Sequence, residues 1–324
     1  MKFYYKSMKN EANQWLAHKI SFKQINNLKP KLHLKACGKK FFKLCYEEKT
    51  LFWGRQHYCH YGVALLKTFD YASILTHIRS SEIEKRKDLP QAEWLESWSV
   101  YFINDVEKKA NEVLYDGEWL MTAHIHTPKY SSYVQLHEND MGANDIYGVE
   151  NSLKETPFQQ IDWFVGDVED SLVNLKKINE YDGRLKWWQK KAKENALPPI
   201  VLLYISGLDN YIILDGHYRL KAAYDVGINV DILVLRPVKK SVYTWDNEKV
   251  KNSILKNIEH NNFGIEQTNN LLIQAYHNQH ICYDSTTRVF GSCTQGMKEV
   301  ISYLHKLDRI DLMQSFFDGE WGEK

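Results

Sequence analysis

Five consecutive residues, Asp215, Gly216, His217, Tyr218 and Arg219, combine side chains suited to phosphate chemistry. They follow an apolar run typical of a buried strand and precede a run with helical spacing. A helix N-terminus carries unpaired N–H groups and a partial positive charge, which attract an anion. Gly216 lets a phosphate approach the backbone, and Arg219 can donate two hydrogen bonds to its oxygens. The pattern predicts a phosphate site where strand meets helix.

The polar residues of this joint have two interpretations. In the functional one, Asp215 holds Mg²⁺ or takes a proton, and His217 donates to a phosphate or shuttles a proton. In the structural one, Asp215 caps the helix, Gly216 makes a tight turn, and His217 and Arg219 are satisfied by local contacts. Because capped strand–turn–helix joints are common, the residue types alone do not separate the two.

The elements around the joint follow from periodicity and turn residues. Apolar runs predict strands at 200–205, 211–214 and 230–235, the last one ended by Pro237. Helical spacing predicts helices at 184–196 and 218–226, the second closed by Gly227. Residues 171–178 suit a strand, and Tyr181-Asp182-Gly183 is a turn signal.

The motif and the order of these elements together resemble the ParB/sulfiredoxin-like superfamily. The motif reads Asp215-Gly216-His217-Tyr218-Arg219-Leu220-Lys221-Ala222-Ala223, after a strand that begins Pro198-Pro199-Ile200 and before one that contains Val230-Asp231-Ile232. The resemblance covers about residues 170–238. It implies a small mixed sheet with helices, in which the 218–226 helix starts at the rim of a pocket.

Three branches of this superfamily differ at the joint. Sulfiredoxins carry a nucleophilic cysteine where this chain has His217, so their chemistry is excluded. Chromosome-partitioning ParB proteins bind CTP through a Glu-Arg-Arg type stretch beside a DNA-reading helix-turn-helix, whereas this chain has His217, Tyr218 and Arg219 there. The branch with an Asp-Gly-His-His-Arg motif resembles free-serine kinases, and here Tyr218 replaces its second histidine.

Resemblance to the kinase branch implies roles for the residues. Asp215, His217 and Arg219 would surround the phosphates beside Gly216 and Tyr218, and Asp215 would organise the metal. An upstream acid, Glu180 or Asp182, would act as the base, the alternative being that both are ordinary turn residues.

The implied cofactors are Mg²⁺ and ATP or another nucleotide. The implied reaction is phosphoryl transfer to a small hydroxylated acceptor, or nucleotide hydrolysis. On this hypothesis, Arg219→Ala abolishes nucleotide binding and leaves the fold intact.

Histidines and tryptophans elsewhere give weaker signals. His124 and His126 share one face of an expected strand and could bind a metal with His57 or His137, but the spacing matches no known zinc site. Exposed or hydrogen-bonded histidines are the alternative. The pair Trp187-Trp188 suits either a core or a protein interface.

The whole chain is predicted to be an α+β protein with three regions. Residues 1–150 form an aromatic-rich α/β region, residues 151–240 contain the ParB/sulfiredoxin-like domain, and residues 241–324 are helical. Periodicity further predicts strands at 40–52 and 118–136, and helices at 61–79, 91–113, 248–259, 267–280 and 297–317.

Composition and charge argue against several classes. The 324 residues are 44% hydrophobic and 26% charged, which is typical of a globular chain rather than a disordered one. The net charge is +1 and only 8 residues are Arg, so nothing favours nucleic acid or a membrane as partner. The N-terminus lacks the apolar stretch of a secretion signal. The five cysteines form no CxxC pair, which suits unpaired thiols in the cytoplasm.

A second function, from a different class, stays open. The expected phosphate site occupies a small part of the chain, and the large regions on either side carry no recognisable catalytic motif. Such a chain could be a bacterial immunity or antitoxin-type protein that binds and neutralises a cognate toxin on a ParB-like scaffold. The sequence therefore leaves open whether the protein is an enzyme.

Overall fold

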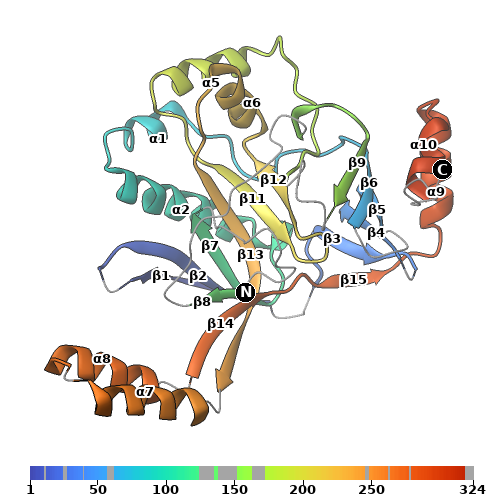
Figure 1. The fold of residues 1–324 in the computed structure, drawn as a ribbon. Coiled ribbons are helices and arrows are strands. Elements are labelled where there is room, and N and C mark those ends of the chain that lie inside the picture. Colours follow the sequence, from blue (N-terminus) through green and yellow to red (C-terminus); the bar gives the residue numbers. More distant parts are fainter. Residues whose placement is uncertain are drawn as a thin grey trace.

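The computed structural model describes residues 1–10, 12–24, 28–38, 40–56, 62–123, 135–137, 152–162, 172–244, 248–261, 263–276 and 279–317. Within these residues, two mixed β-sheets and the helices around them form an α+β fold, which confirms the predicted fold class (Figure 1). No helix in these ranges is long and apolar enough to cross a membrane.

The larger sheet follows the order β1, β2, β7, β13, β11, β12, β10, and β14 joins β13 and β8. Its strands are β1 (Lys2–Lys9), β2 (Trp15–Lys23), β7 (Gly117–Ala123), β8 (Gln135–His137), β10 (Leu172–Val173), β11 (Ile200–Ile205), β12 (Asn210–Asp215), β13 (Ile232–Thr244) and β14 (Gln279–Ser285). Every residue of β11 and β12 is buried, as continuous apolar runs require. The strands expected at 200–205 and 211–214 are confirmed, whereas the one at 171–178 is only two residues long.

Strands from all three sequence regions share this larger sheet. β7, from residues 1–150, pairs antiparallel with β13, and β14, from residues 241–324, pairs with the far half of the same strand. β10, β11, β12 and the first half of β13 are neighbours, as the resemblance implies. They belong to a wider sheet, however, and do not form a small separate one.

The smaller sheet follows the order β15, β3, β4, β5, β6, β9. Its strands are β3 (Leu32–Ala36), β4 (Phe41–Tyr46), β5 (Lys49–Gln56), β6 (Gly62–Lys67), β9 (Phe158–Asp162) and β15 (Val289–Ser292). The helices α9 (Gly296–Lys306) and α10 (Asp311–Phe317) lie beside it (Figure 1). Val300, Leu304 and Phe316 of these helices pack against Trp53 and Leu66 of the sheet.

The two sheets share one hydrophobic core, and helix α2 closes it. α2 (Gln91–Lys108) and the short α3 (Ala110–Val113) confirm the helix predicted at 91–113. Trp98 and Phe102 of α2 are fully buried in the same cluster as Trp119 of β7 and Phe52 of β5. The other helices of the body are α1 (Ser80–Glu84), α5 (Gly183–Lys193) and α6 (His217–Val226).

The helix expected at 61–79 is wrong. Residues 62–67 form β6, whose six residues are all buried, and residues 68–79 carry no helix. A short, continuously apolar run fits a strand buried on both faces as well as it fits a helix, and periodicity cannot separate them.

Pro237 does not end the strand in which it lies, contrary to the prediction. β13 pairs with β11 up to Leu235 and with β14 from Val238 onward, so Pro237 sits where one partner replaces the other. At this changeover its carbonyl accepts the Thr286 N–H, and Pro237 stays in register with Trp119 of β7 on the other side, so the strand continues although proline has no N–H to donate. The helix expected at 297–317 is also interrupted, since Asp308 adopts φ +53° between α9 and α10.

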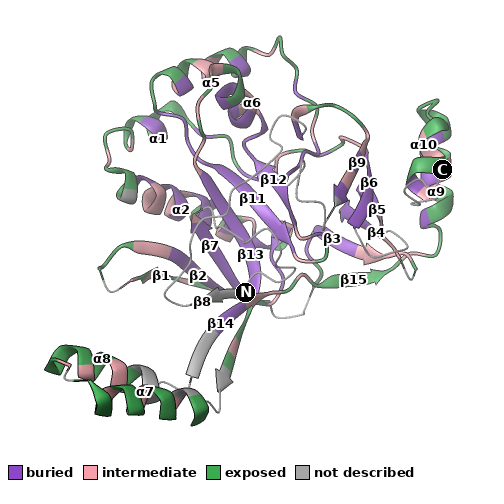
Figure 2. Ribbon diagram, viewed as in Figure 1, coloured by how far each residue is buried: buried purple, intermediate pink, exposed green. Residues whose placement is uncertain are grey.

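A helical hairpin projects from the end of β13 and β14 (Figure 1). It consists of α7 (Glu248–His260) and α8 (Ile265–Tyr276), close to the predicted helices at 248–259 and 267–280. None of its described side chains is buried, in contrast to the interior of the sheets (Figure 2). We call this hairpin the arm.

Candidate functional site

The predicted joint between strand and helix is present. β12 ends at Asp215, Gly216 occupies the N-cap position in the left-handed conformation (φ +104°), and α6 starts at His217. A Cβ at Gly216 would lie 2.7 Å from Cγ2 of Ile200, so both the dihedral angle and the space require glycine. No side chain caps α6, and its first-turn N–H groups point away from the helix body at this joint.

Asp215 and Arg219 form a buried ion pair beneath the joint. Nη2 of Arg219 donates to Oδ2 of Asp215 at 2.9 Å and to the Pro199 carbonyl at 2.9 Å. The hydroxyl of Ser73 donates to Oδ1 of Asp215 at 2.8 Å. Each carboxylate oxygen therefore accepts one hydrogen bond, and Asp215 does not cap α6. Asp215 therefore lacks the capping role that the structural interpretation gave it.

His217 is buried against the segment that precedes α1. Its side chain is 3% exposed, its ring lies 5.8 Å from that of Tyr71, and Nε2 has no hydrogen-bond partner among the described residues. Burial lowers the pKa of His217 to about 3, so the imidazole is neutral at ordinary pH. A neutral ring with an open nitrogen can hydrogen-bond a ligand but carries no charge toward it.

These residues line a cavity of about 140 Å³ at the start of α6. Three cations line it: Arg219, which is paired with Asp215, Lys176 after β10 and Arg184 on α5. Burial together with the charge of Arg184 lowers the pKa of Lys176. Aromatic rings complete the lining: Trp187, Trp188 and Tyr218. The Arg184 guanidinium lies 5.0 Å from the centre of the Tyr218 ring. The cavity thus combines positive charge with ring faces.

Glu180 and Asp182 do not lie in this cavity. Glu180 is largely exposed and pairs with Lys221 of α6 at 3.5 Å. Asp182 caps α5 by accepting the Arg184 N–H, and the same arginine's side-chain hydrogen bonds lower its pKa. In this structure both acids have the structural role that was the alternative to a catalytic base.

Sequence reasoning missed several cavity residues. Ser73 and His77 come from residues 68–79, which were expected to be helical, and nothing in their spacing points to the joint. Lys176 and Arg184 lie on either side of the Asp182 turn, and their positive charge was the one feature of the sequence that could have pointed to an anion-binding cavity here. Trp188 is buried and packs on Arg219 at 5.4 Å, while Trp187 is half-buried at the cavity.

The histidines proposed as metal ligands cannot be compared with the structure. His57, His124 and His126 fall outside the described residues, as does the side chain of His137. In the parts of the chain that the structure describes, no three His, Cys, Asp or Glu side chains gather closely enough to hold a metal ion.

Comparison of the chain with protein-family models, with curated proteins and with solved structures gives no significant match in any of the three. The ParB/sulfiredoxin-like resemblance therefore rests on the motif and on the order of elements around it.

Proposed function

We propose that the chain binds a nucleotide, with the phosphates at the start of α6 and the base against the aromatic residues beside α5. The supporting observation is the lining of one cavity. Lys176 and Arg184 supply positive charge, the uncapped first turn of α6 supplies N–H donors, and Trp187 and Tyr218 supply ring faces. Phosphate needs the first two features and a base needs the third.

His217 fits a contact with the neutral part of such a ligand. Its Nε2 is unpartnered, buried and uncharged, so it suits a hydroxyl or a base edge better than a phosphate oxygen. In this proposal Arg219 supports the floor of the cavity through Asp215 and does not fork onto the phosphates.

Phosphoryl transfer to a small hydroxylated acceptor, or hydrolysis, is the chemistry that the resemblance adds to binding. Asp215 is the one carboxylate in the described lining. Each of its oxygens accepts one hydrogen bond, from Ser73 or from Arg219, and keeps a second acceptor position for Mg²⁺ or an acceptor proton.

The test is a titration of the chain with ATP, ADP, CTP and GTP, with and without Mg²⁺, followed by calorimetry and thermal shift. Arg184→Ala and Lys176→Ala should each weaken binding about tenfold or more, because each removes a charge-assisted contact. Lys177→Ala is the matched control, since Lys177 is an exposed neighbour of the same charge outside the cavity. Absence of any shift with the wild-type chain would refute the proposal.

Trp187→Ala separates base from phosphate recognition. It should weaken ATP binding and leave the binding of inorganic triphosphate unchanged, because the ring face contacts only the base. Equal losses for both ligands would mean that Trp187 shapes the cavity and does not stack on the base.

A second candidate, an immunity or antitoxin-type protein, is favoured by the arm. Ile265 is 83% exposed and Ile273 is 63% exposed on a hairpin that projects from the body. Apolar side chains displayed on a projecting element are typical of a binding surface. If this function holds, Ile265→Asp with Ile273→Asp abolishes neutralisation of a toxin encoded beside this chain's gene, whereas Lys176→Ala does not. The opposite result favours the nucleotide site.

A further inference from the structure

Two thiols from distant parts of the chain meet at the edge of the smaller sheet. β3 and β15 pair in parallel with Ala36 opposite Ser292, and Cys37 and Cys293 each follow directly. The Cys293 N–H donates to the Ala36 carbonyl at 2.7 Å, so the backbones of the two cysteines lie side by side. Both cysteines are partly exposed. The register of the two strands, the backbone hydrogen bond between them and partial exposure to solvent thus all bring Cys37 and Cys293 together as one accessible pair.

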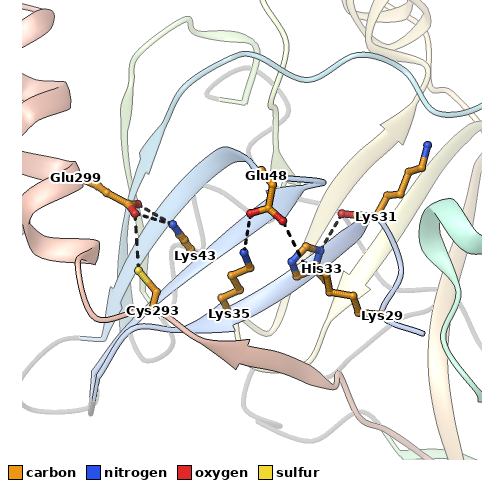
Figure 3. Close-up of polar contacts among 8 residues, drawn as sticks. All are labelled: Lys29, Lys31, His33, Lys35, Lys43, Glu48, Cys293 and Glu299. Carbon is orange, nitrogen blue, oxygen red and sulfur yellow. Dashed lines mark hydrogen bonds and ion pairs between the residues drawn. The ribbon is translucent and has the colours of Figure 1, made fainter. Parts of the chain in front are cut away.

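A carboxylate stands beside one of the two sulfurs. The Cys293 thiol donates to Oε1 of Glu299 at 3.8 Å (Figure 3). Lys43 at 2.7 Å and the Trp53 indole N–H at 3.0 Å hold this carboxylate in place. The hydrogen bond to this fixed carboxylate therefore orients the Cys293 thiol. Burial and the neighbouring Cys293 raise the pKa of Cys37 to about 12, so the Cys37 thiol is protonated and Cys293 is the first of the two to react.

We propose that Cys37 and Cys293 are a redox pair that forms a reversible disulfide by exchange with a low-molecular-weight disulfide, RSSR. The Cys293 thiol loses its proton to solvent, and its sulfur attacks one sulfur of RSSR. The S–S bond of RSSR breaks, and the leaving sulfur takes up a proton from solvent and departs as RSH. The Cys37 sulfur then attacks the Cys293 sulfur of the mixed disulfide and releases the second RSH with its own proton. Two protein thiols are oxidised, and one RSSR is reduced to two RSH.

The bond would fasten the C-terminal segment to the N-terminal sheet. In the reduced protein, α9 and α10 are held on this sheet by apolar packing and by the Lys43–Glu299 pair. A covalent link beside that pair restricts the unfolded chain across most of its length, so the oxidised protein is the more stable form.

The experiment treats the full chain with oxidised glutathione, blocks remaining thiols by alkylation, and maps the digested peptides by mass. The expected product is one cross-linked peptide pair containing Cys37 and Cys293. The oxidised chain should also run faster on a non-reducing gel, because the bridge closes a long loop, and melt a few degrees higher. Dithiothreitol reverses all three changes.

Cysteine-to-serine variants identify the two thiols that form the cross-link. Cys37→Ser and Cys293→Ser should each abolish the cross-link and the gel shift, whereas Cys45→Ser, which replaces a buried thiol on the neighbouring strand β4, should keep both. If a variant fails to fold, the wild-type peptide map still decides the question. Separate glutathione adducts on Cys37 and Cys293 without a cross-link, or a bridge to another cysteine, would overturn the proposal.

Discussion

Arg219 lies beneath α6, where its guanidinium is shared between Asp215 and the Pro199 carbonyl. The motif showed that an acid and an arginine flank the glycine, and four residues apart on a helix start they are within reach of each other. What it could not show is that they satisfy one another. That outcome depends on Ser73, which arrives from a distant segment to occupy the second carboxylate oxygen.

At this scale the first prediction is that Arg219→Ala destabilises the fold, contrary to the expectation from the motif. It leaves Asp215 buried without its counter-charge, which costs about 3–5 kcal/mol. Urea unfolding measures the loss. Lys221→Ala is the control, because its pairs with Asp225 and Glu180 lie at the surface and are worth under about 1 kcal/mol. Equal costs for the two variants would contradict the buried-pair account.

The second residue-scale prediction concerns pH. The folded pKa of His217 is about 3, below its ordinary value of 6.5, so between these values the unfolded chain binds a proton that the folded chain does not. Stability therefore falls as the pH drops from 6.5 toward 3. The His217→Gln variant lacks this contribution. When the pH is lowered from 6 to 5, the unfolding constant of wild type should therefore rise by up to about tenfold more than that of the variant. Parallel stability curves would show that His217 is not neutralised by burial.

At the scale of elements, spacing predicted best where polar and apolar residues alternate with a clear period. α2 and the two helices of the arm followed from helical periodicity, and β11 and β12 from short apolar runs between turn residues. The 61–79 region failed because apolar residues at helical spacing continue beyond the buried run of β6, with no turn residue to mark where the strand ends. The same region brings Ser73 and His77 to the cavity, so the error in the fold and the gap in the site have one cause.

The third prediction compares two glycines that bound α6. Gly216→Ala should cost about 3 kcal/mol, because a Cβ meets Ile200 at 2.7 Å and φ is +104°. Gly227→Ala should cost only about 1 kcal/mol, since φ is +73° but nothing lies within 4 Å of its Cβ. Thermal and urea unfolding of both variants measure the difference. Similar costs would mean that the dihedral angle alone, and not the contact with Ile200, requires glycine at the joint.

At the scale of the molecule, the larger sheet crosses the boundaries that the composition changes indicated near residues 150 and 240. Composition reports where residue usage shifts, whereas strand pairing is decided by which edges meet in three dimensions. β13 pairs with β7 on one side and with β11 and then β14 on the other, so it joins all three regions.

The fourth prediction follows from this shared sheet. A fragment of residues 151–240, expressed alone, should not fold, because β13 then loses β7 and exposes Leu233 and Leu235, which are fully buried in the whole chain. Circular dichroism and amide-proton dispersion in NMR spectra measure the outcome, with the full chain as reference. A folded fragment would show that the region is an independent domain after all.

The pairing order has a consequence for the chain as it is synthesised. β2 finds its neighbour β7 only after about a hundred residues have followed, and β7 must then wait for β13. β3 can pair with β15 only when nearly the whole described chain has left the ribosome. The same is true of the packing of α9 and α10 against Trp53 and Leu66. Until then, edge strands and apolar faces of the N-terminal half are open to solvent. Contacts so distant in sequence slow folding and prolong that exposure, which makes the nascent chain a natural client for chaperones.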